Sequence, residues 1–167
     1  EMYLGYIADG CDEMMSLVDS LLELGQSTKS ELMREPVDIS RLVSAIDREL
    51  RVSYPSVAVD LKVMPQMQAY GDARLLYAAL NNLLQNAWSF SAKTICPKVF
   101  VYQDFTLSTG VPVFCVEDNG PGFHQHELES LFEPFNRRKG AEGGADLGVG
   151  LATVKRIIER HNGRVWV

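Results

Sequence analysis

The sequence predicts an α+β fold: a two-layer sandwich of a mixed, mainly antiparallel sheet with helices on one face, preceded by one long helix. Stretches with apolar residues three and four apart, typical of amphipathic helices, are interspersed with short stretches of alternating apolar and polar residues, typical of half-buried strands. Two of the strand-like stretches are joined by a short segment that suits a hairpin loop. With 167 residues, 46% of them hydrophobic and 23% charged, the chain has an ordinary globular composition and room for one domain plus an appendage.

The long first helix is expected over residues 1 to about 25. Its apolar residues follow a heptad-like spacing: Leu4, Ile7, Cys11, Met14, Val18, Leu21 and Gly25. Such a stripe needs a partner, either another chain or a segment outside this sequence, although an ordinary core helix is the alternative. Gly25 and the polar residues 26–30 read as the helix end and a linker. We therefore expect two parts, residues 1–30 and residues 31–167.

The second part is expected to contain three longer helices or helical runs and several strands. Asp38 or Ser40 caps the first helix, whose apolar face includes Leu42, Val43, Ile46 and Leu50. Gly71 and Asp72 open the second helix, which presents a broad apolar face. The other expected elements are strands over 57–63, 98–104 and 111–118, a hairpin loop at 107–110, a short helix over 125–131, a mobile loop over 136–147, a helix over 149–161 and a strand over 163–167.

Charge and cysteine content exclude several classes of protein. The formal net charge is -6, which argues against a nucleic-acid-binding surface, because such a surface is basic. The three cysteines form no Cys-x-x-Cys pair, so neither a disulfide framework nor a zinc site is indicated, and a reducing, cytoplasmic setting fits. No apolar run reaches the length of a membrane span. The sequence starts in a helical pattern and stops in a strand-like one, so we expect a piece of a longer protein.

Two polar clusters interrupt the apolar pattern in the middle of the chain. Asn82 and Asn86 are four apart and share one face of the second helix, where their oxygens suit a hard cation such as Mg²⁺. The alternative is a pair of exposed or capping asparagines. Asp118 ends a strand and is followed by Gly120 and Gly122, which let the backbone approach a flat ligand while the carboxylate accepts a hydrogen bond from an amine. The alternative is a plain Asp-Asn-Gly-Pro turn.

A third cluster opens the last helix. Gly148 and Gly150 leave backbone N–H groups free to face an anion at a helix N-terminus, which carries a partial positive charge. Such a phosphate site needs no basic side chain, which suits an acidic chain. A single Gly-x-Gly is weak evidence alone, and neither the dinucleotide-binding fingerprint nor the P-loop pattern is complete here.

The order of these motifs resembles the ATP-binding domain of sensor histidine kinases, within the GHKL group of ATPases. Residues 82–87 (Asn-Leu-Leu-Gln-Asn-Ala) resemble the N box, 118–122 (Asp-Asn-Gly-Pro-Gly) the G1 box, 131–135 (Leu-Phe-Glu-Pro-Phe) the F box and 148–152 (Gly-Val-Gly-Leu-Ala) the G2 box. The resemblance covers nearly the whole chain, and residues 1–25 resemble the second helix of the dimerisation and phosphoacceptor hairpin. The last strand of the family's domain is expected to be missing.

The resemblance implies a role for each matching residue. Asn86 would ligate the Mg²⁺ that bridges the ATP phosphates, with Asn82 supporting it. Asp118 would accept a hydrogen bond from the adenine amino group, with Gly120 and Gly122 in the same turn. Loop 136–147 would form the ATP lid. The remaining implied ATP-binding residues are Phe132 and Phe135 at the start of the lid, Arg137 and Arg138 near the phosphates, and Gly148, Gly150 and Leu151 in the phosphate cradle.

Some residues depart from the family pattern. Ser89 stands where the family often has Lys or Arg, so phosphate affinity or transfer is expected to be weaker. Asp146 stands where Gly is common, and an acidic group near the triphosphate is unfavourable unless the metal offsets its charge or it points away. The phosphoacceptor histidine is absent. His161 fits a helix end, and His124 and His126 lie in the wrong element.

The resemblance therefore implies a two-component kinase domain that binds ATP and Mg²⁺ and transfers the γ-phosphoryl to a histidine outside this chain, for relay to a response-regulator aspartate. Homodimerisation through the first helix and a cytoplasmic location are implied, with any membrane contact only through missing parts and no nucleic-acid partner. Alternatives are a degenerate nucleotide-binding module, or pseudokinase, and another GHKL ATPase.

Overall fold

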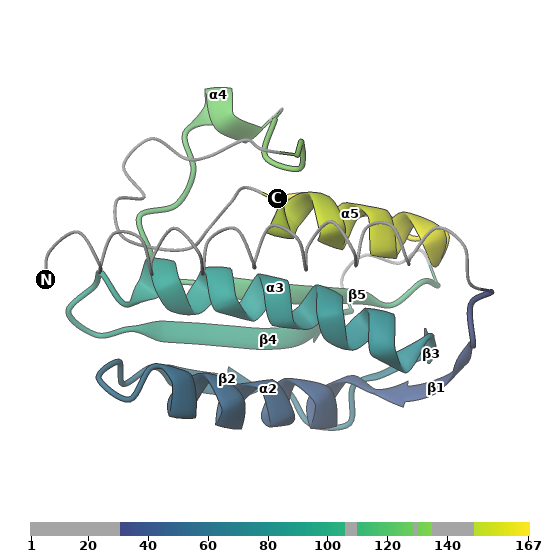
Figure 1. Cartoon of the computed structure of the whole chain (residues 1–167), viewed down its shortest axis with the longest axis horizontal. Helices are drawn as coiled ribbons and strands as arrows, with labels where there is room; N and C mark the ends of the chain where they lie inside the picture. Colours follow the sequence, from purple (N-terminus) through teal and green to yellow (C-terminus); the bar gives the residue numbers. More distant parts are fainter. Residues whose placement is uncertain (1–30, 106–109, 129, 135–148) are drawn as a thin grey trace, which may run out of the picture. The chain divides into compact units, whose positions relative to one another are not determined.

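The computed structural model describes residues 31–105, 110–128, 130–134 and 149–167. The chain divides into two compact units, and each is described by itself. The first unit is Leu32–His124, and the second includes Gln125–Val167. The expected helix over residues 1–25, the linker over 26–30 and the loop over 136–147 lie outside the described residues. Figure 1 shows the elements in chain order.

The described residues of the first unit form two helices and five strands in two small sheets. Its strands are β1 (Glu35–Asp38), β2 (Asp60–Val63), β3 (Gln68–Gly71), β4 (Lys98–Asp104) and β5 (Val113–Asp118), and its helices are α2 (Ile39–Ser53) and α3 (Ala73–Ser91). An antiparallel pair, β1 with β3, forms one sheet. The other has the order β2-β4-β5, with β2 parallel to β4 and β5 antiparallel to β4.

The expected α+β class is confirmed, but the expectation of one sheet is wrong. β1 and β3 are not among the strands predicted from the sequence, and the strand expected over 57–63 begins only at Asp60. β2 pairs with β4, which lies far along the chain, rather than with the neighbouring β3. Two parallel strands need a long crossover connection, and α3 lies within this one. The expected strand 98–104 matches β4, and the strand expected over 111–118 begins at Val113.

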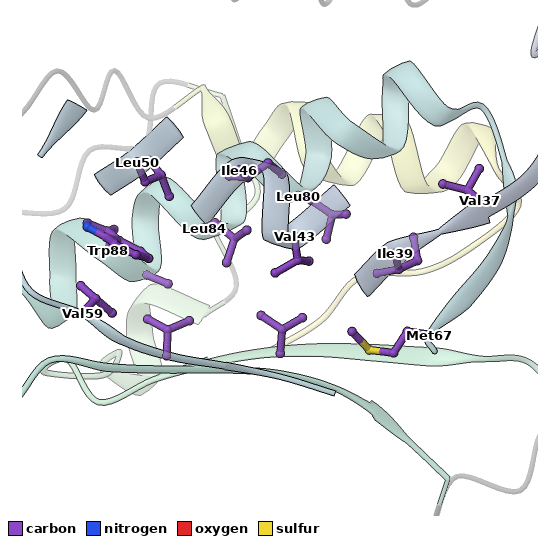
Figure 2. Close-up of a cluster of buried hydrophobic side chains, with 13 residues drawn as sticks. Val37, Ile39, Val43, Ile46, Leu50, Val59, Met67, Leu80, Leu84 and Trp88 are labelled. Carbon is purple, nitrogen blue, oxygen red and sulfur yellow. The ribbon is translucent and has the colours of Figure 1, made fainter. Parts of the chain in front are cut away.

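α2 and α3 pack on one face of the three-stranded sheet, and the core lies between them (Figure 2). α2 buries one residue per turn, at Ile39, Val43, Ile46 and Leu50, as its apolar spacing predicts. Of the two predicted caps, Asp38 and Ser40, the structure has Asp38, whose Oδ1 accepts a hydrogen bond from the Arg41 N–H at 2.9 Å. The rest of the buried cluster comes from α3, the strands and the loops between them: Val37, Val59, Met67, Leu80, Leu84, Ala87, Trp88, Val99 and Val101.

The second unit contains α4 (Gln125–Leu128), a turn at residues 130–134 and α5 (Gly150–Arg160). The helix predicted over 125–131 is therefore longer than α4, which ends at Leu128. His161 is the C-cap residue of α5; its Nδ1 lies 2.8 Å from the Ile157 carbonyl oxygen, and Asn162 follows with φ +61°. This confirms the structural role expected for His161. Residues 163–167 are described but form no strand, so that expectation is wrong.

None of the helices in the described ranges is long and apolar enough to cross a membrane.

Candidate functional site

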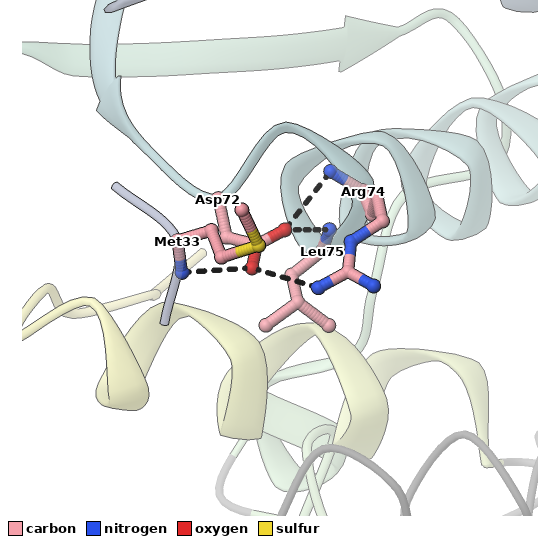
Figure 3. Close-up of polar contacts among 4 residues, drawn as sticks. All are labelled: Met33, Asp72, Arg74 and Leu75. Atoms are coloured by element: carbon pink, nitrogen blue, oxygen red, sulfur yellow. Dashed lines mark hydrogen bonds and ion pairs between the residues drawn. The ribbon is translucent and has the colours of Figure 1, made fainter. Parts of the chain in front are cut away.

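α3, the helix that contains Asn82 and Asn86, is capped at its N-terminus by a buried aspartate. Asp72 caps it: its Oδ1 accepts from the backbone N–H of Arg74 at 3.1 Å and of Leu75 at 3.4 Å (Figure 3). Its Oδ2 accepts from the Met33 N–H at 3.2 Å and from the Arg74 guanidinium at 3.3 Å. The Asp72 side chain is only 2% exposed. One buried carboxylate therefore joins the helix start to residue 33, where the chain enters this unit.

The charge of Asp72 is stabilised by these donors. Burial is the largest single influence on its pKa and acts to raise it. The hydrogen bonds from the Arg74 side chain and from the Met33 and Leu75 backbones, together with the Arg74 charge, outweigh burial, so the pKa of Asp72 lies below its ordinary value. Asp72 is thus an ionised buried group at neutral pH.

A second contact braces α3 against α2. The Tyr77 hydroxyl donates a hydrogen bond to the Glu49 carboxylate. This bond, with smaller effects of burial and of the Glu49 charge, raises the pKa of Tyr77 to about 12. The helix that carries the asparagines is therefore fixed to α2 as well as to the entry segment.

Asn82 and Asn86 lie one turn apart on α3, both partly exposed. Asn82 Nδ2 donates to the Ala78 carbonyl at 2.9 Å, which uses its amide nitrogen and leaves its carbonyl oxygen for another partner. Among the described residues, no hydrogen bond engages the Asn86 side chain. In the same part of the chain, no group of three or more His, Cys, Asp or Glu residues is placed to hold a metal ion. An oxygen-ligated cation here would therefore rely on the asparagine oxygens and on a ligand's own oxygens.

Asp118 is the last residue of β5, opposite Val99 in the ladder, on the face that carries the core. Its Oδ1 accepts from the Gly120 N–H at 2.8 Å. Within the described ranges its Oδ2 has no hydrogen-bond partner, so one carboxylate oxygen is engaged by the turn and the other can accept from a ligand. Gly120 N–H thus fixes the direction of this carboxylate.

The two glycines of this turn differ in what they allow. A Cβ on Gly120 would lie 2.6 Å from Asp118 Oδ1 and 3.1 Å from the Cβ of Phe90, at the last turn of α3. Gly120 therefore lets β5's end lie directly against α3, one turn beyond Asn86. Gly122 has φ +67°, and a Cβ there would meet nothing within 4 Å. The Cβ direction of Gly122 is therefore not filled by other atoms of the described residues.

The other expected ligand-binding residues belong to the second unit or lie outside the described residues. Phe132 lies, partly buried, in the turn at 130–134. Gly150 and Leu151 begin α5, whose N-cap residue, Val149, makes no side-chain capping hydrogen bond. Phe135, Arg137, Arg138 and Gly148 fall outside the described residues. The structure thus brings Asn82, Asn86, Asp118, Gly120 and Gly122 into one unit.

Sequence reasoning gave no role to Asn119 and no long-range contact to Asp72. Asn119 stands inside the Asp-x-Gly-x-Gly motif, and its carboxamide bonds the chain at residues 96 and 98. The sequence predicts that Asp72 opens a helix, whereas its bond to Met33 spans 39 positions. A polar residue directly after a strand was the available signal for Asn119. Nothing local signals the partner of Asp72.

Residues 71–167 match the family described as histidine kinase-, DNA gyrase B-, and HSP90-like ATPase. The signal transduction histidine-protein kinase/phosphatase MprB of Mycobacterium avium (strain 104) is 32% identical over 156 residues, which are 93% of this chain and 29% of that protein. The chain thus spans less than a third of the length of this curated relative.

Solved structures share the fold. That of a mycobacterial sensor histidine kinase, MprB, has a TM-score of 0.63 and 28% identity, over 78% of this chain and 81% of the other. Full-length ShkA in complex with AMPPNP has a TM-score of 0.70 and 24% identity, over 96% of this chain and 34% of the other.

Proposed function

Because the chain belongs to the family of histidine kinase-, DNA gyrase B- and HSP90-like ATPases and corresponds to the catalytic ATP-binding domain of sensor histidine kinases, we propose that it binds ATP with Mg²⁺ and donates the γ-phosphoryl to a histidine. The accepting histidine would lie outside this chain, on the helical hairpin whose second helix residues 1–25 resemble. The phosphoryl group would then pass to an aspartate of a response regulator.

The Asp118 carboxylate is the observation that carries this proposal. One of its oxygens accepts from Gly120 N–H, and the other is left to accept from the amino group of adenine. A carboxylate accepts but does not donate, so it selects a base edge that carries a donor. The open space beside Gly122 supports a base lying flat against the backbone.

Binding of the ATP phosphates is assigned to the metal ion and to backbone N–H groups. The Asn86 oxygen, supported by Asn82, is the proposed Mg²⁺ ligand on this chain, with ATP oxygens completing the shell. We assign phosphate contacts to the N-terminus of α5, with Gly150 and Leu151, because a helix N-terminus presents backbone N–H groups to an anion. Gly148, Arg137 and Arg138 would act there too, with Phe132 and Phe135 at the start of the lid.

The chemistry fits such a site because phosphoryl transfer depends mainly on positioning and on neutralising charge. When bound, Mg²⁺ supplies that neutralisation between the phosphate oxygens. With Mg²⁺ bound, the asparagines would hold the triphosphate without a strongly basic surface, which agrees with a net charge of -6. The complete protein would dimerise through residues 1–25 and act at a cytoplasmic location.

Calorimetric titration with ADP and AMPPNP, with and without Mg²⁺, tests the binding. Asp118→Asn keeps an oxygen for Gly120 N–H but replaces the accepting oxygen with a donor, so we expect the affinity to fall at least about tenfold, the effect of 1.4 kcal/mol. Asn86→Ala should weaken binding mainly when Mg²⁺ is present. Gln85→Ala, an exposed amide on the same helix, is the matched control and should bind as the wild type does. Unchanged affinity in both site variants would overturn the assignment.

Phosphate transfer is tested in the complete protein, with its hairpin, by labelling with radioactive ATP. We expect acid-labile, alkali-stable phosphate on a histidine. A second candidate function, a pseudokinase that binds nucleotide without transfer, is favoured by Ser89, which is exposed on α3 where a basic residue is common in the family. Tight binding with no phosphohistidine under varied Mg²⁺ would establish that alternative.

A further inference from the structure

The side chain of Asn119 replaces a peptide group at the end of the β4–β5 ladder. Its backbone N–H donates to the Lys98 carbonyl at 3.2 Å, and its side-chain Oδ1 accepts from the Lys98 N–H at 2.8 Å. In an ordinary antiparallel hydrogen-bonded pair, the backbone carbonyl would accept that second bond. Here the carboxamide oxygen does so, and the backbone of Asn119 is free to leave the sheet.

The same carboxamide also holds the loop before β4. Asn119 Nδ2 donates to the Cys96 carbonyl at 2.8 Å, so both ends of the side-chain amide are used. Thr94 Oγ1 lies 3.5 Å from Asn119 Oδ1, and its shorter bond, of 2.8 Å, goes to the carbonyl of Ser91 at the end of α3. Asn119 therefore connects the end of β5 to the segment that leaves α3.

This anchor sets where the next residues lie. Directly after Asn119 the chain turns so sharply that Gly120 N–H reaches back to Asp118 Oδ1. Gly120 at the same time lies against Phe90, where a Cβ would lie 3.1 Å from the Phe90 carbonyl carbon and Cβ. Asp118 precedes Asn119 and Gly120 follows it. Any shift of the end of the ladder would therefore move both partners of the Gly120 N–H to Asp118 Oδ1 bond, which orients the carboxylate.

We propose that Asn119 is a positioning residue for base recognition: its carboxamide fixes the turn through which Gly120 N–H directs the Asp118 carboxylate at the adenine amino group. This rests on the proposed function, in which Asp118 reads that amino group. Asn119 need not touch the nucleotide, since both ends of its amide already have backbone partners. Its loss should therefore change which base is preferred, beyond any change in stability.

The test compares ADP with IDP, whose base carries a carbonyl where adenine carries the amino group. Calorimetric affinities for both are measured with the wild type, Asn119→Ala, Asn119→Asp and Lys98→Ala. The wild type should prefer ADP. Asn119→Ala should lose most of that preference, with ADP affinity falling about tenfold, as expected for one hydrogen bond, and IDP affinity changing little. Lys98→Ala is the matched control, because only the backbone of Lys98 bonds Asn119 and its side chain is exposed.

Two further measurements separate positioning from general damage. Asn119→Asp keeps an acceptor for the Lys98 N–H but not the donor to Cys96, so it should restore part of the preference. Amide hydrogen exchange should rise at Lys98 in Asn119→Ala but stay slow at the buried Val99 and Val101.

The possible failures are distinguishable. A wild type that binds neither nucleotide, or both equally, would refute the role of Asp118 and with it the proposed function. A wild type that prefers ADP, combined with an Asn119→Ala variant that keeps the same preference, would overturn the positioning role alone. Equal losses for ADP and IDP in Asn119→Ala and Asn119→Asp would also overturn it, because they indicate a structural effect only.

Discussion

Replacing the buried cap Asp72 should destabilise the first unit more than replacing an exposed cap does. Asp72→Ala removes the N-cap of α3, which costs about 1 kcal/mol in typical helices. It also removes the acceptor of the Met33 N–H and the charge-assisted bond from Arg74, which together contribute about 1–2 kcal/mol. We therefore expect a loss of about 2–3 kcal/mol in the free energy of unfolding. Asp38→Ala is the matched control: it removes a single exposed capping bond, to Arg41, and should cost about 1 kcal/mol.

Urea denaturation followed by tryptophan fluorescence measures this difference. Trp88 is buried in the first unit and Trp166 is exposed in the second, so Trp166→Phe serves as the background and leaves Trp88 as the reporter. With a urea dependence of about 2 kcal/mol per molar, Asp72→Ala should lower the midpoint by about 1–1.5 M and Asp38→Ala by about 0.5 M. Equal shifts in the two variants would refute the reasoning that burial and the Met33 bond make Asp72 the stronger anchor.

The same carboxylate predicts a pH dependence. Because the pKa of Asp72 is lower in the folded protein than its ordinary value of 3.8, the ionised form stabilises the fold. That contribution is present above the unfolded pKa and is lost as the pH falls through the folded pKa. The difference in the free energy of unfolding between the wild type and Asp72→Asn should therefore be largest at pH 7 and should decrease below about pH 4. A gap that widens on acidification would contradict the direction of the shift.

Two further changes test the turn and the core. Gly120→Ala places a Cβ 2.6 Å from Asp118 Oδ1 and should weaken ADP binding at least about tenfold by calorimetry, whereas the exposed Ser89→Ala should leave it unchanged. Leu84→Ala removes a fully buried side chain from the first unit's core and should cost about 2–5 kcal/mol in the same urea assay. The exposed Val52→Ala, on α2, should stay within about 0.5 kcal/mol and is the control.

The elements that the sequence predicted well are those with a strong period of their own. α2 buries a residue at every turn, and β4 alternates buried Val99 and Val101 with more exposed neighbours. In such segments the local pattern already specifies which face meets the core. The boundaries of β4 were predicted without error for that reason.

The missed and wrong strands depend on partners far away in the chain. β1 and β3 are only four residues long, with one buried residue each, Val37 and Gly71, so neither is long enough to give a clear strand pattern in the sequence. Their pairing is set by the register of Pro36 opposite Tyr70, which no local window contains. Residues 163–167, in contrast, have a composition that favours a strand but form none. A strand exists only where another strand pairs with it.

The residues of the site could be predicted from sequence motifs, but the hydrogen bonds that orient them could not. The spacing of Asn82 and Asn86 placed both on one helix face, and the structure confirms that α3 carries them. The bonds that fix Asp118 run through Asn119 to residues 96 and 98, more than 20 positions earlier. Long-range hydrogen bonds of this kind leave no periodic trace in the sequence.

Asp72 and Asn119 should affect different properties, stability for the first and base recognition for the second. Asp72 acts at the first turn, 14 residues before Asn86 and roughly 21 Å away along the helix axis. Asn119 acts beside Asp118 itself but on a largely exposed loop, where few buried contacts depend on it. Asp72→Ala should therefore lower stability while ADP affinity changes less than about twofold, and Asn119→Ala should do the reverse. Asp72→Ala could instead weaken ADP binding as much as Asn119→Ala does. That result would mean that α3 transmits a shift along its whole length. The orientation of the ADP-binding side chains would then depend on α3 as a rigid body rather than on the turn after β5.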